Sequence, residues 1–144
     1  ELENLKSYVF INHVRYGERI KVNFFIAPDT IDYHVPKLVI QPFIENAFFH
    51  AFSKKNEGYI HVLISQESGS LLCEIVDNGD GMESGGEELS LSNPESKRQL
   101  FTGIGIKNVH DRIFLLYGED YGVTVMSKLN EGTTIKIRLP LIKA

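Results

Sequence analysis

Four short segments carry polar or glycine residues in places where a fold alone would not require them. These segments are Gln41–His50, Asp77–Gly81, Gly103–Asn108 and Gly132–Thr134. Asparagine, histidine and aspartate supply ligand atoms and hydrogen-bonding groups, while glycine lets a backbone approach a ligand closely. Each segment also has a purely structural interpretation, which must be weighed against the chemical one.

Asn46 and His50 are four residues apart in the first segment, so on a helix they lie on one face. That face is next to the apolar face that the same helix would turn toward the core. Asparagine is a mediocre helix former, and its place in the middle of a helix invites a functional explanation. A capped or solvated helix edge is an equally good interpretation of this segment alone. In a binding site, Asn46 would offer a neutral oxygen ligand to Mg²⁺.

The second segment, Asp77–Gly81, follows an apolar strand. Asn-Gly at that place is typical of a hairpin turn, but a long irregular stretch follows it and no paired strand. A calcium loop is excluded, because Gly79 and Gly81 stand where ligands should be and Met82 replaces the turn glycine. The carboxylate of Asp77 would suit an exocyclic amine, as on adenine.

The third segment, Gly103–Asn108, begins a predicted helix, whose free N–H groups favour a phosphate. It is not a dinucleotide fingerprint, because Asn108 replaces the third glycine and no strand precedes it. The fourth segment, Gly132–Thr134, is most simply a hairpin turn. Each signal is weak alone, but together the four segments predict an adenine-nucleotide site beneath a lid.

Apolar periodicity predicts the elements that would position these segments. Helices are expected over 1–16 with a stop at Gly17, from Pro36 onward, and from Gly103 to a stop at Gly118; strands are expected at 20–26, 60–64, 71–75, 123–127 and 133–139. Hairpins joining the later strands favour a mixed, mostly antiparallel sheet. With helices covering one face, the fold class is an α/β two-layer sandwich.

Both later helices show an apolar face. The expected core residues are Ile40, Ile44, Ala47, Phe48 and Ala51 in the helix opened by Pro36, and Ile106, Val109, Ile113 and Leu116 in the helix before Gly118. Between Asp77 and Thr102, by contrast, glycines and a proline break any regular element. An irregular run of about twenty residues is long for a compact domain, so this stretch is either functional or disordered.

Composition narrows the possible functions. The chain has 144 residues and a net charge of −4, which argues against a nucleic-acid partner. Its one cysteine, Cys73, alternates with apolar residues and is expected to be a buried free thiol. No apolar run approaches the ~20 residues of a membrane span, and no signal peptide is visible. We expect a single domain, 1–144, cut from a longer protein and located in the reducing cytoplasm.

The order and wording of the four segments resemble a known family of ATP-binding domains. That family is shared by sensor histidine kinases, type II topoisomerases, Hsp90-type chaperones and mismatch-repair ATPases. Gln41–His50 resembles its N box, Asp77–Gly81 and Gly103–Asn108 its two glycine boxes, and Gly132-Thr133 its threonine motif. The likeness covers about residues 36–140. The amino-acid sequence of residues 38–50, and that of the preceding segment 1–22, is similar to the corresponding sequence of the LytS-like sensor kinases of two-component systems.

This resemblance implies a Bergerat-type fold, with a five-stranded mixed sheet under three helices, a leading helix over 1–17 and a mobile ATP lid over 80–102. It also implies roles for single residues. Asp77 would bind the adenine amine with support from Thr133, Asn46 would hold Mg²⁺, and His50 would face the phosphates. The remaining ATP contacts it implies are Gly79, Gly81, Gly103, Gly105, Ile106 and Asn108.

One departure from the family bears on the reaction. Members that hydrolyse ATP carry a glutamate four residues before the magnesium asparagine, whereas this chain has Pro42 there. Glu45 lies about 100° round the helix from Asn46 and does not simply substitute, although a role near the metal stays open. The resemblance therefore favours phosphoryl transfer to a protein acceptor.

The resemblance also implies partners. The phospho-acceptor histidine would lie in an upstream dimerisation segment, because none of the five histidines here has that context. The phosphoryl group would then pass to a response regulator receiver domain. The whole protein would be a homodimer associated with a membrane, with this domain in the cytoplasm. The alternatives are an ATP-hydrolysing member of the same superfamily and a non-catalytic interaction domain that retains the fold.

Overall fold

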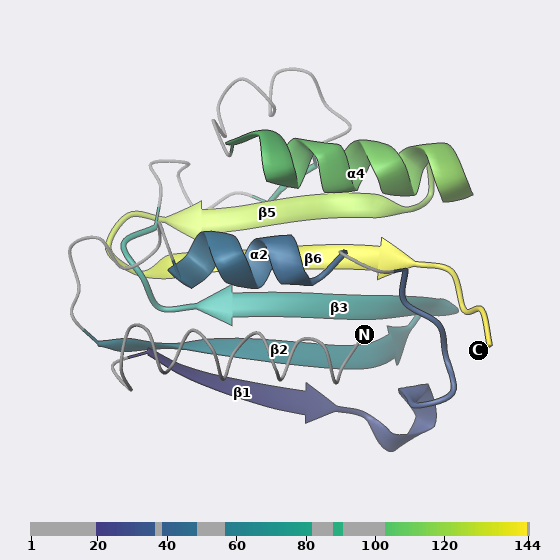
Figure 1. Ribbon diagram of the computed structural model, residues 1–144, viewed down its shortest axis with the longest axis horizontal. Helices are drawn as coiled ribbons and strands as arrows, with labels where there is room; N and C mark the ends of the chain where they lie inside the picture. The colour runs from purple at the N-terminus through teal and green to yellow at the C-terminus, as the bar shows by residue number, and fades with distance from the viewer. Residues whose placement is uncertain (1–19, 37–38, 49–56, 82–87, 91–102, 144) are drawn as a thin grey trace.

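A single mixed β-sheet organises the molecule (Figure 1). The computed structural model describes residues 20–36, 39–48, 57–81, 88–90 and 103–143. In spatial order the strands are β1 (Ile20–Ile26), β2 (Gly58–Glu67), β3 (Ser70–Asp77), β6 (Gly132–Leu139), β5 (Gly122–Lys128) and β4 (Glu88–Ser90). β1 pairs with β2 in parallel and every other pair is antiparallel, which confirms the predicted mixed sheet.

The five predicted strands all form, and their turns follow from local sequence. Ser68 and Gly69 both have positive φ in the two-residue turn between β2 and β3, as such hairpin turns require. Asn130 also has positive φ, in the turn between β5 and β6. The prediction of no regular element between Asp77 and Thr102 is wrong at β4, which pairs with β5. The rest of the predicted lid beyond Gly81, like the leading helix over 1–17, lies outside the described residues.

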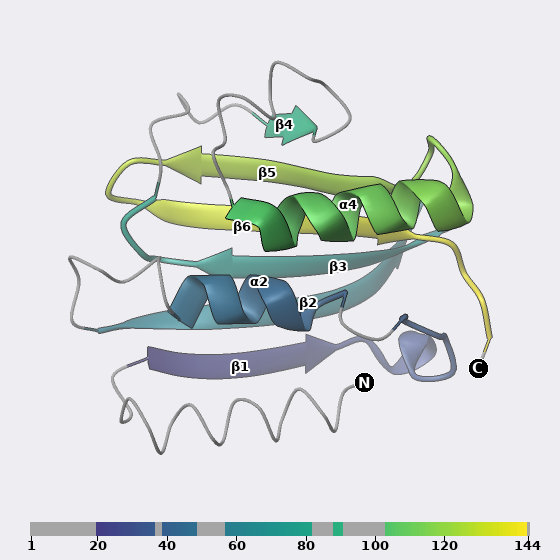
Figure 2. The ribbon, with the colours of Figure 1, turned by 45° about the horizontal axis from the view of Figure 1, so that its top comes forward.

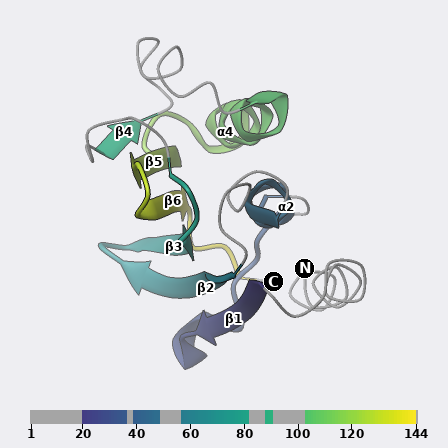
Figure 3. The same ribbon diagram turned by 90° about the vertical axis from the view of Figure 1, so that its left-hand side faces the viewer.

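Two helices, α2 and α4, lie on one side of the sheet, as Figure 3 shows end-on. α2 spans Gln41–Asn46 and α4 spans Gly103–Tyr117, and a short 3₁₀ turn, η1, spans Pro28–Thr30. The predicted start of α2 at Pro36 is wrong. The proline in its first turn is Pro42, where the lack of an N–H costs no helical hydrogen bond.

The core lies between the helices and the sheet. From α2 and the residues beside it, Ile40, Ile44, Ala47 and Phe48 are buried as predicted, while Ala51 lies outside the described residues. Cys73 is fully buried on β3, which confirms the expected buried free thiol. This two-layer packing is the predicted α/β sandwich.

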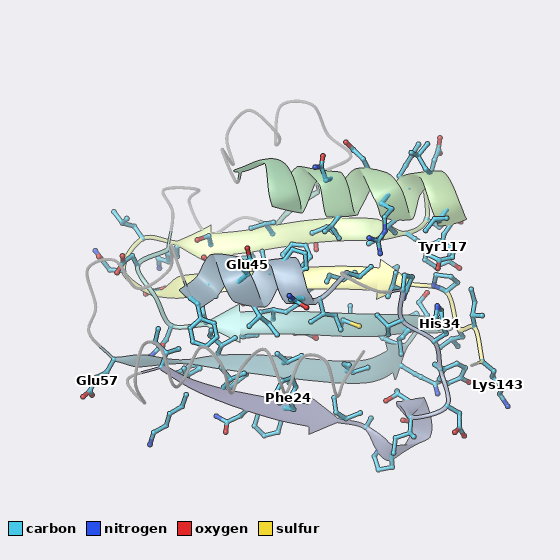
Figure 4. All side chains as sticks on the ribbon, in the orientation of Figure 1. Phe24, His34, Glu45, Glu57, Tyr117 and Lys143 are labelled. Atoms are coloured by element: carbon cyan, nitrogen blue, oxygen red, sulfur yellow. The ribbon has the colours of Figure 1, made fainter. Side chains whose placement is uncertain are left out.

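Of the four residues predicted for the apolar face of α4, Ile106 lies outside the residues whose burial is described, and one of the other three differs from the prediction. Val109 and Ile113 are buried, but Leu116 is 58% exposed. Tyr117, four residues after Ile113, packs against the core instead, because residues at i and i+4 share a helix face. Tyr117 (Figure 4) meets Tyr121 edge-on with ring centroids 6.2 Å apart. Gly118 ends the helix as predicted, with positive φ and its N–H bonded to the carbonyl of Phe114.

A buried histidine joins α4 to β5. The Nδ1 atom of His110, which is 2% exposed, accepts a hydrogen bond from the backbone N–H of Val123 at 3.0 Å. Gly122 makes room for the ring, because a Cβ atom there would lie 2.7 Å from the imidazole Cε1. The contact fixes the start of β5 against the middle of the helix.

The other face of the sheet carries no helix among the described residues (Figure 3). On that face the rings of Tyr59 and His61 stack with centroids 4.2 Å apart, and Phe25 meets His61 edge-on. Near the C-terminal end, His34 donates its backbone N–H to the carbonyl of Ile142, close to Lys143 (Figure 4). No described helix is both long enough and apolar enough to cross a membrane.

Candidate functional site

The candidate site is a row of polar side chains at one end of the helix-covered face of the sheet. Asp77 on β3 pairs with Thr133 on β6, and Thr133 pairs with Ser127 on β5. Directly paired residues point to the same face, and these three positions are in phase with the core. The next two rows across the same strands are entirely apolar; they are Ile75, Ile135, Val125 and Cys73, Ile137, Val123. An apolar face thus ends abruptly in three oxygen-bearing side chains.

Asp77 ends β3 and is only 7% exposed. Its Oδ1 atom accepts a buried hydrogen bond from the backbone N–H of Gly79 at 2.9 Å. Burying a carboxylate costs free energy unless hydrogen bonds or a partner compensate it. A carboxylate kept at this position is therefore well suited to accept hydrogen bonds from a ligand.

Thr133 and Ser127 are joined by their hydroxyl groups. The two oxygens lie 2.8 Å apart, and Ser127 Oγ also contacts the carbonyl oxygen of Gly132 at 3.1 Å. Sequence reasoning singled out Thr133 but missed Ser127, which is 2% exposed. The signal was present, because Ser127 is in phase with the apolar Val123 and Val125 on a strand of period two.

The loop after Asp77 packs against the β5–β6 hairpin and does not start a hairpin of its own. The N–H of Asn130 donates to the carbonyl of Asp80 at 2.6 Å. A Cβ atom on Gly81, which has positive φ, would collide with the carbonyl of Lys128. The side chain of Asn78 accepts from the N–H of Tyr59 at 2.8 Å, at the start of β2. Gly81 therefore serves the close approach of two backbones at the site, whereas Gly79 contributes its N–H to Asp77.

The start of α4, which was predicted to face a phosphate, and the end of α2 lie at this same end of the sheet. Asn46 was predicted in the middle of a helix, and the structure has it at the end of α2. In Figures 1 and 2, α2 ends and α4 begins on the side where β3 ends and β6 starts. Asn46 is the last residue of α2. The first turn of α4 contains Gly103, Gly105 and Ile106, and Asn108 follows as an exposed residue.

The structure does not connect two further predicted residues, Glu45 and His50, with the row of Asp77, Thr133 and Ser127. Glu45 is exposed on α2 (Figure 4), where it contributes nothing to the core. His50 lies outside the described residues. Within the described part of the chain, no group of three or more histidine, cysteine, aspartate or glutamate side chains could hold a metal ion by itself.

Comparison with known proteins identifies close counterparts. Residues 32–143 match the family described as Histidine kinase-, DNA gyrase B-, and HSP90-like ATPase. The chain is 32% identical to the sensor protein LytS of Bacillus cereus over an alignment of 144 positions, which covers 97% of this chain and 24% of that protein. It is 30% identical to the sensor histidine kinase YesM of Bacillus subtilis, over 97% of this chain and 23% of that protein. The chain therefore spans about a quarter of the length of these relatives.

A solved structure shows the same fold. The mycobacterial sensor histidine kinase MprB superposes with a TM-score of 0.61 at 19% identity, covering 99% of this chain and 95% of that one. At this identity the likeness concerns the fold alone. It agrees with the mixed sheet and one-sided helical layer described above.

Proposed function

Because the chain belongs to the family of histidine kinase-, DNA gyrase B- and HSP90-like ATPases, we propose that it is the ATP-binding catalytic domain of a two-component sensor histidine kinase. The observation that carries the proposal is the buried polar row of Asp77, Thr133 and Ser127. Their side chains place a carboxylate and two hydroxyl groups at the end of an otherwise apolar face. A ligand that supplies matching donors explains why they are there.

In this proposal the nucleotide lies across the end of the sheet. Asp77 would accept a hydrogen bond from the exocyclic amine of adenine, with Thr133 beside it. The phosphates would lie near Gly103 and Gly105 at the start of α4, because the first N–H groups of a helix have no partner within it and the helix dipole there favours negative charge. The C-terminal end of α2 and the N-terminal end of α4 lie at the same end of the sheet as the row of Asp77, Thr133 and Ser127. This arrangement supports a single binding site (Figure 2).

The proposed metal is Mg²⁺ with Asn46 as its protein ligand. Mg²⁺ commonly keeps several waters and binds through one or two protein oxygens together with substrate phosphates. One amide oxygen at the end of α2 fits that donor set. When bound, Mg²⁺ would neutralise charge on the phosphates.

Phosphoryl transfer is proposed in preference to hydrolysis. Pro42 has no ionisable group to activate a water, and it occupies the first turn of α2. Glu45 is exposed on the same helix. The residues of this chain would bind and orient ATP, while a histidine in an upstream dimerisation segment would accept the phosphoryl group and a response regulator would receive it. The relatives are named as a sensor protein and a sensor histidine kinase, which supports a sensor role for the whole protein. The proposal extends to a homodimer associated with a membrane, with this domain in the cytoplasm.

Calorimetric titration with a non-hydrolysable ATP analogue, with and without Mg²⁺, tests the proposal. We expect saturable binding that strengthens with Mg²⁺. In Asp77→Asn the remaining oxygen would still accept from Gly79 N–H, while an amide donor would replace the second acceptor. Binding should therefore weaken more than about tenfold. Asp120→Asn, in the exposed turn after α4, is the matched control and should bind as wild type.

Two results would contradict this proposal. A folded wild-type chain that does not bind the analogue would leave no nucleotide site and favour an interaction domain. Steady release of phosphate from ATP by the isolated chain would favour an ATP-hydrolysing member of the family.

A further inference from the structure

The contacts of Ser127 determine the direction of the hydrogen bonds in the polar row. Its Oγ lies 3.1 Å from the carbonyl oxygen of Gly132 and 2.8 Å from the hydroxyl oxygen of Thr133. A serine hydroxyl has one proton, and a carbonyl oxygen can only accept. The contact with Gly132 therefore uses the proton of Ser127.

Only one direction then remains for the hydrogen bond between the hydroxyl groups of Ser127 and Thr133. Because Ser127 has already donated its proton, Thr133 must donate to Ser127 Oγ. The single proton of Thr133 is committed to this bond, so the remaining capacity of its oxygen is that of an acceptor. Thr133 is paired with Asp77 across β3 and β6, and a carboxylate is also an acceptor. Two acceptors therefore stand side by side at the end of the sheet.

We propose that Ser127 is a positioning residue that sets the nucleobase selectivity of this site. By accepting the Thr133 proton, it keeps Thr133 Oγ1 an acceptor next to the carboxylate of Asp77. A base with a 6-amino group has two N–H donors that match these acceptors. A base with a 6-oxo group has an acceptor at position 6 and its nearest donor at N1–H, so it does not offer a donor to both acceptors and binds less tightly. This inference rests on the proposed function, since it concerns the base of the same nucleotide.

Selectivity depends on the rotational freedom of the Thr133 hydroxyl group. A site whose buried polar groups are fixed in one direction discriminates strongly against a ligand that leaves them unpaired. Without Ser127 Oγ, the hydroxyl of Thr133 could rotate and donate to a 6-oxo group. Selectivity would fall although neither residue that faces the base had changed.

The test compares ADP with IDP, whose bases differ by an amine or a carbonyl at position 6. The dissociation constants of both are measured by calorimetry for the 144-residue chain and its variants. Wild type should bind ADP more tightly than IDP. In Ser127→Ala the ratio of the two constants should fall about tenfold, mainly through tighter relative binding of IDP. Ser127→Thr keeps a hydroxyl and should restore the wild-type ratio.

Two further variants complete the design. Ser65→Ala, on β2 and facing the opposite side of the sheet by strand alternation, should leave both constants unchanged. Ser127→Cys keeps the volume but accepts hydrogen bonds weakly, so it should lower the ratio even if Ser127→Ala does not fold. Binding of ADP with an unchanged ratio in folded Ser127→Ala or Ser127→Cys would overturn this inference alone. Binding of neither nucleotide by wild type would overturn the proposed function and this inference with it.

Discussion

A Cβ atom on Gly132 would collide with the backbone carbonyl oxygen of Asp77. The lack of a side chain at Gly132 is therefore what lets the end of β3 approach the start of β6. This contact sets Asp77 and Thr133 beside each other in the candidate site. The Gly-Thr pair is thus more than a hairpin turn, because its glycine serves the neighbouring strand.

Replacement of Gly132 should lower the free energy of unfolding far more than replacement of another glycine whose φ is also positive. Gly132→Ala adds a backbone clash to the strain of positive φ, whereas Gly69→Ala adds the strain alone, since nothing lies within 4 Å of its Cβ position. We expect a loss of about 1–2 kcal/mol for Gly69→Ala and at least about 1–3 kcal/mol more for Gly132→Ala. Urea unfolding measures both, and equal losses would contradict the close approach of β3 and β6.

The two faces of α4 should respond differently to truncation. Ile113 is fully buried and Leu116 is mostly exposed. Ile113→Ala should lower the free energy of unfolding by about 2–5 kcal/mol, and Leu116→Ala by no more than about 0.5 kcal/mol. Urea denaturation of the two variants is the measurement. A large loss for Leu116→Ala would show that α4 is rotated relative to the orientation described here.

His110, which lies between α4 and β5, should stabilise the fold mainly through its Nδ1 atom, which accepts a hydrogen bond. His110→Leu leaves the buried N–H of Val123 without its Nδ1 partner, so we expect a loss of about 1–3 kcal/mol. His61→Leu, on the partly exposed opposite face of the sheet, is the control and should cost less than about 1 kcal/mol. Thermal unfolding of both variants decides the matter. Similar melting temperatures would indicate that the hydrogen bond to Val123 adds little.

The thiol of Cys73 should be inaccessible in the native state. It is fully buried on β3, so a thiol reagent such as Ellman's should label it only as fast as the chain unfolds. A Glu67→Cys variant places a second thiol at an exposed residue of β2 and should react at once. Immediate labelling of Cys73 in native wild type would contradict its burial.

Local pattern was enough to predict most of the sheet. Strict alternation in segments such as 20–26 fixed which residues face the core, and Ser68-Gly69 marked the turn between β2 and β3. β4 was missed because it has three residues and its only pairing is with β5, far along the chain. A pairing of that kind leaves no periodic signal in the sequence.

The errors at the helices and in the site have similar causes. Both Pro36 and Pro42 could open a helix by residue type, and tertiary packing selected Pro42. Leu116 fits the spacing of an apolar face, but the side of α4 that meets the sheet continues to Tyr117. Asp77 and Thr133 were found from their motifs. The register that adds Ser127 to them runs from β3 to β6 and on to β5, and the pairing of β3 with β6 joins strands that are far apart in the sequence.

The pairing of β3 with β6, which forms a long-range seam in the sheet, has a consequence for folding. β2 with β3, and β5 with β6, are two local hairpins that can each close early. Asp77 belongs to one hairpin and Thr133 to the other, so neither hairpin contains a binding site. The site exists only once the long-range seam has closed. A ligand that needs both residues would therefore stabilise only the completed domain, and its binding would report that the last step of assembly had occurred.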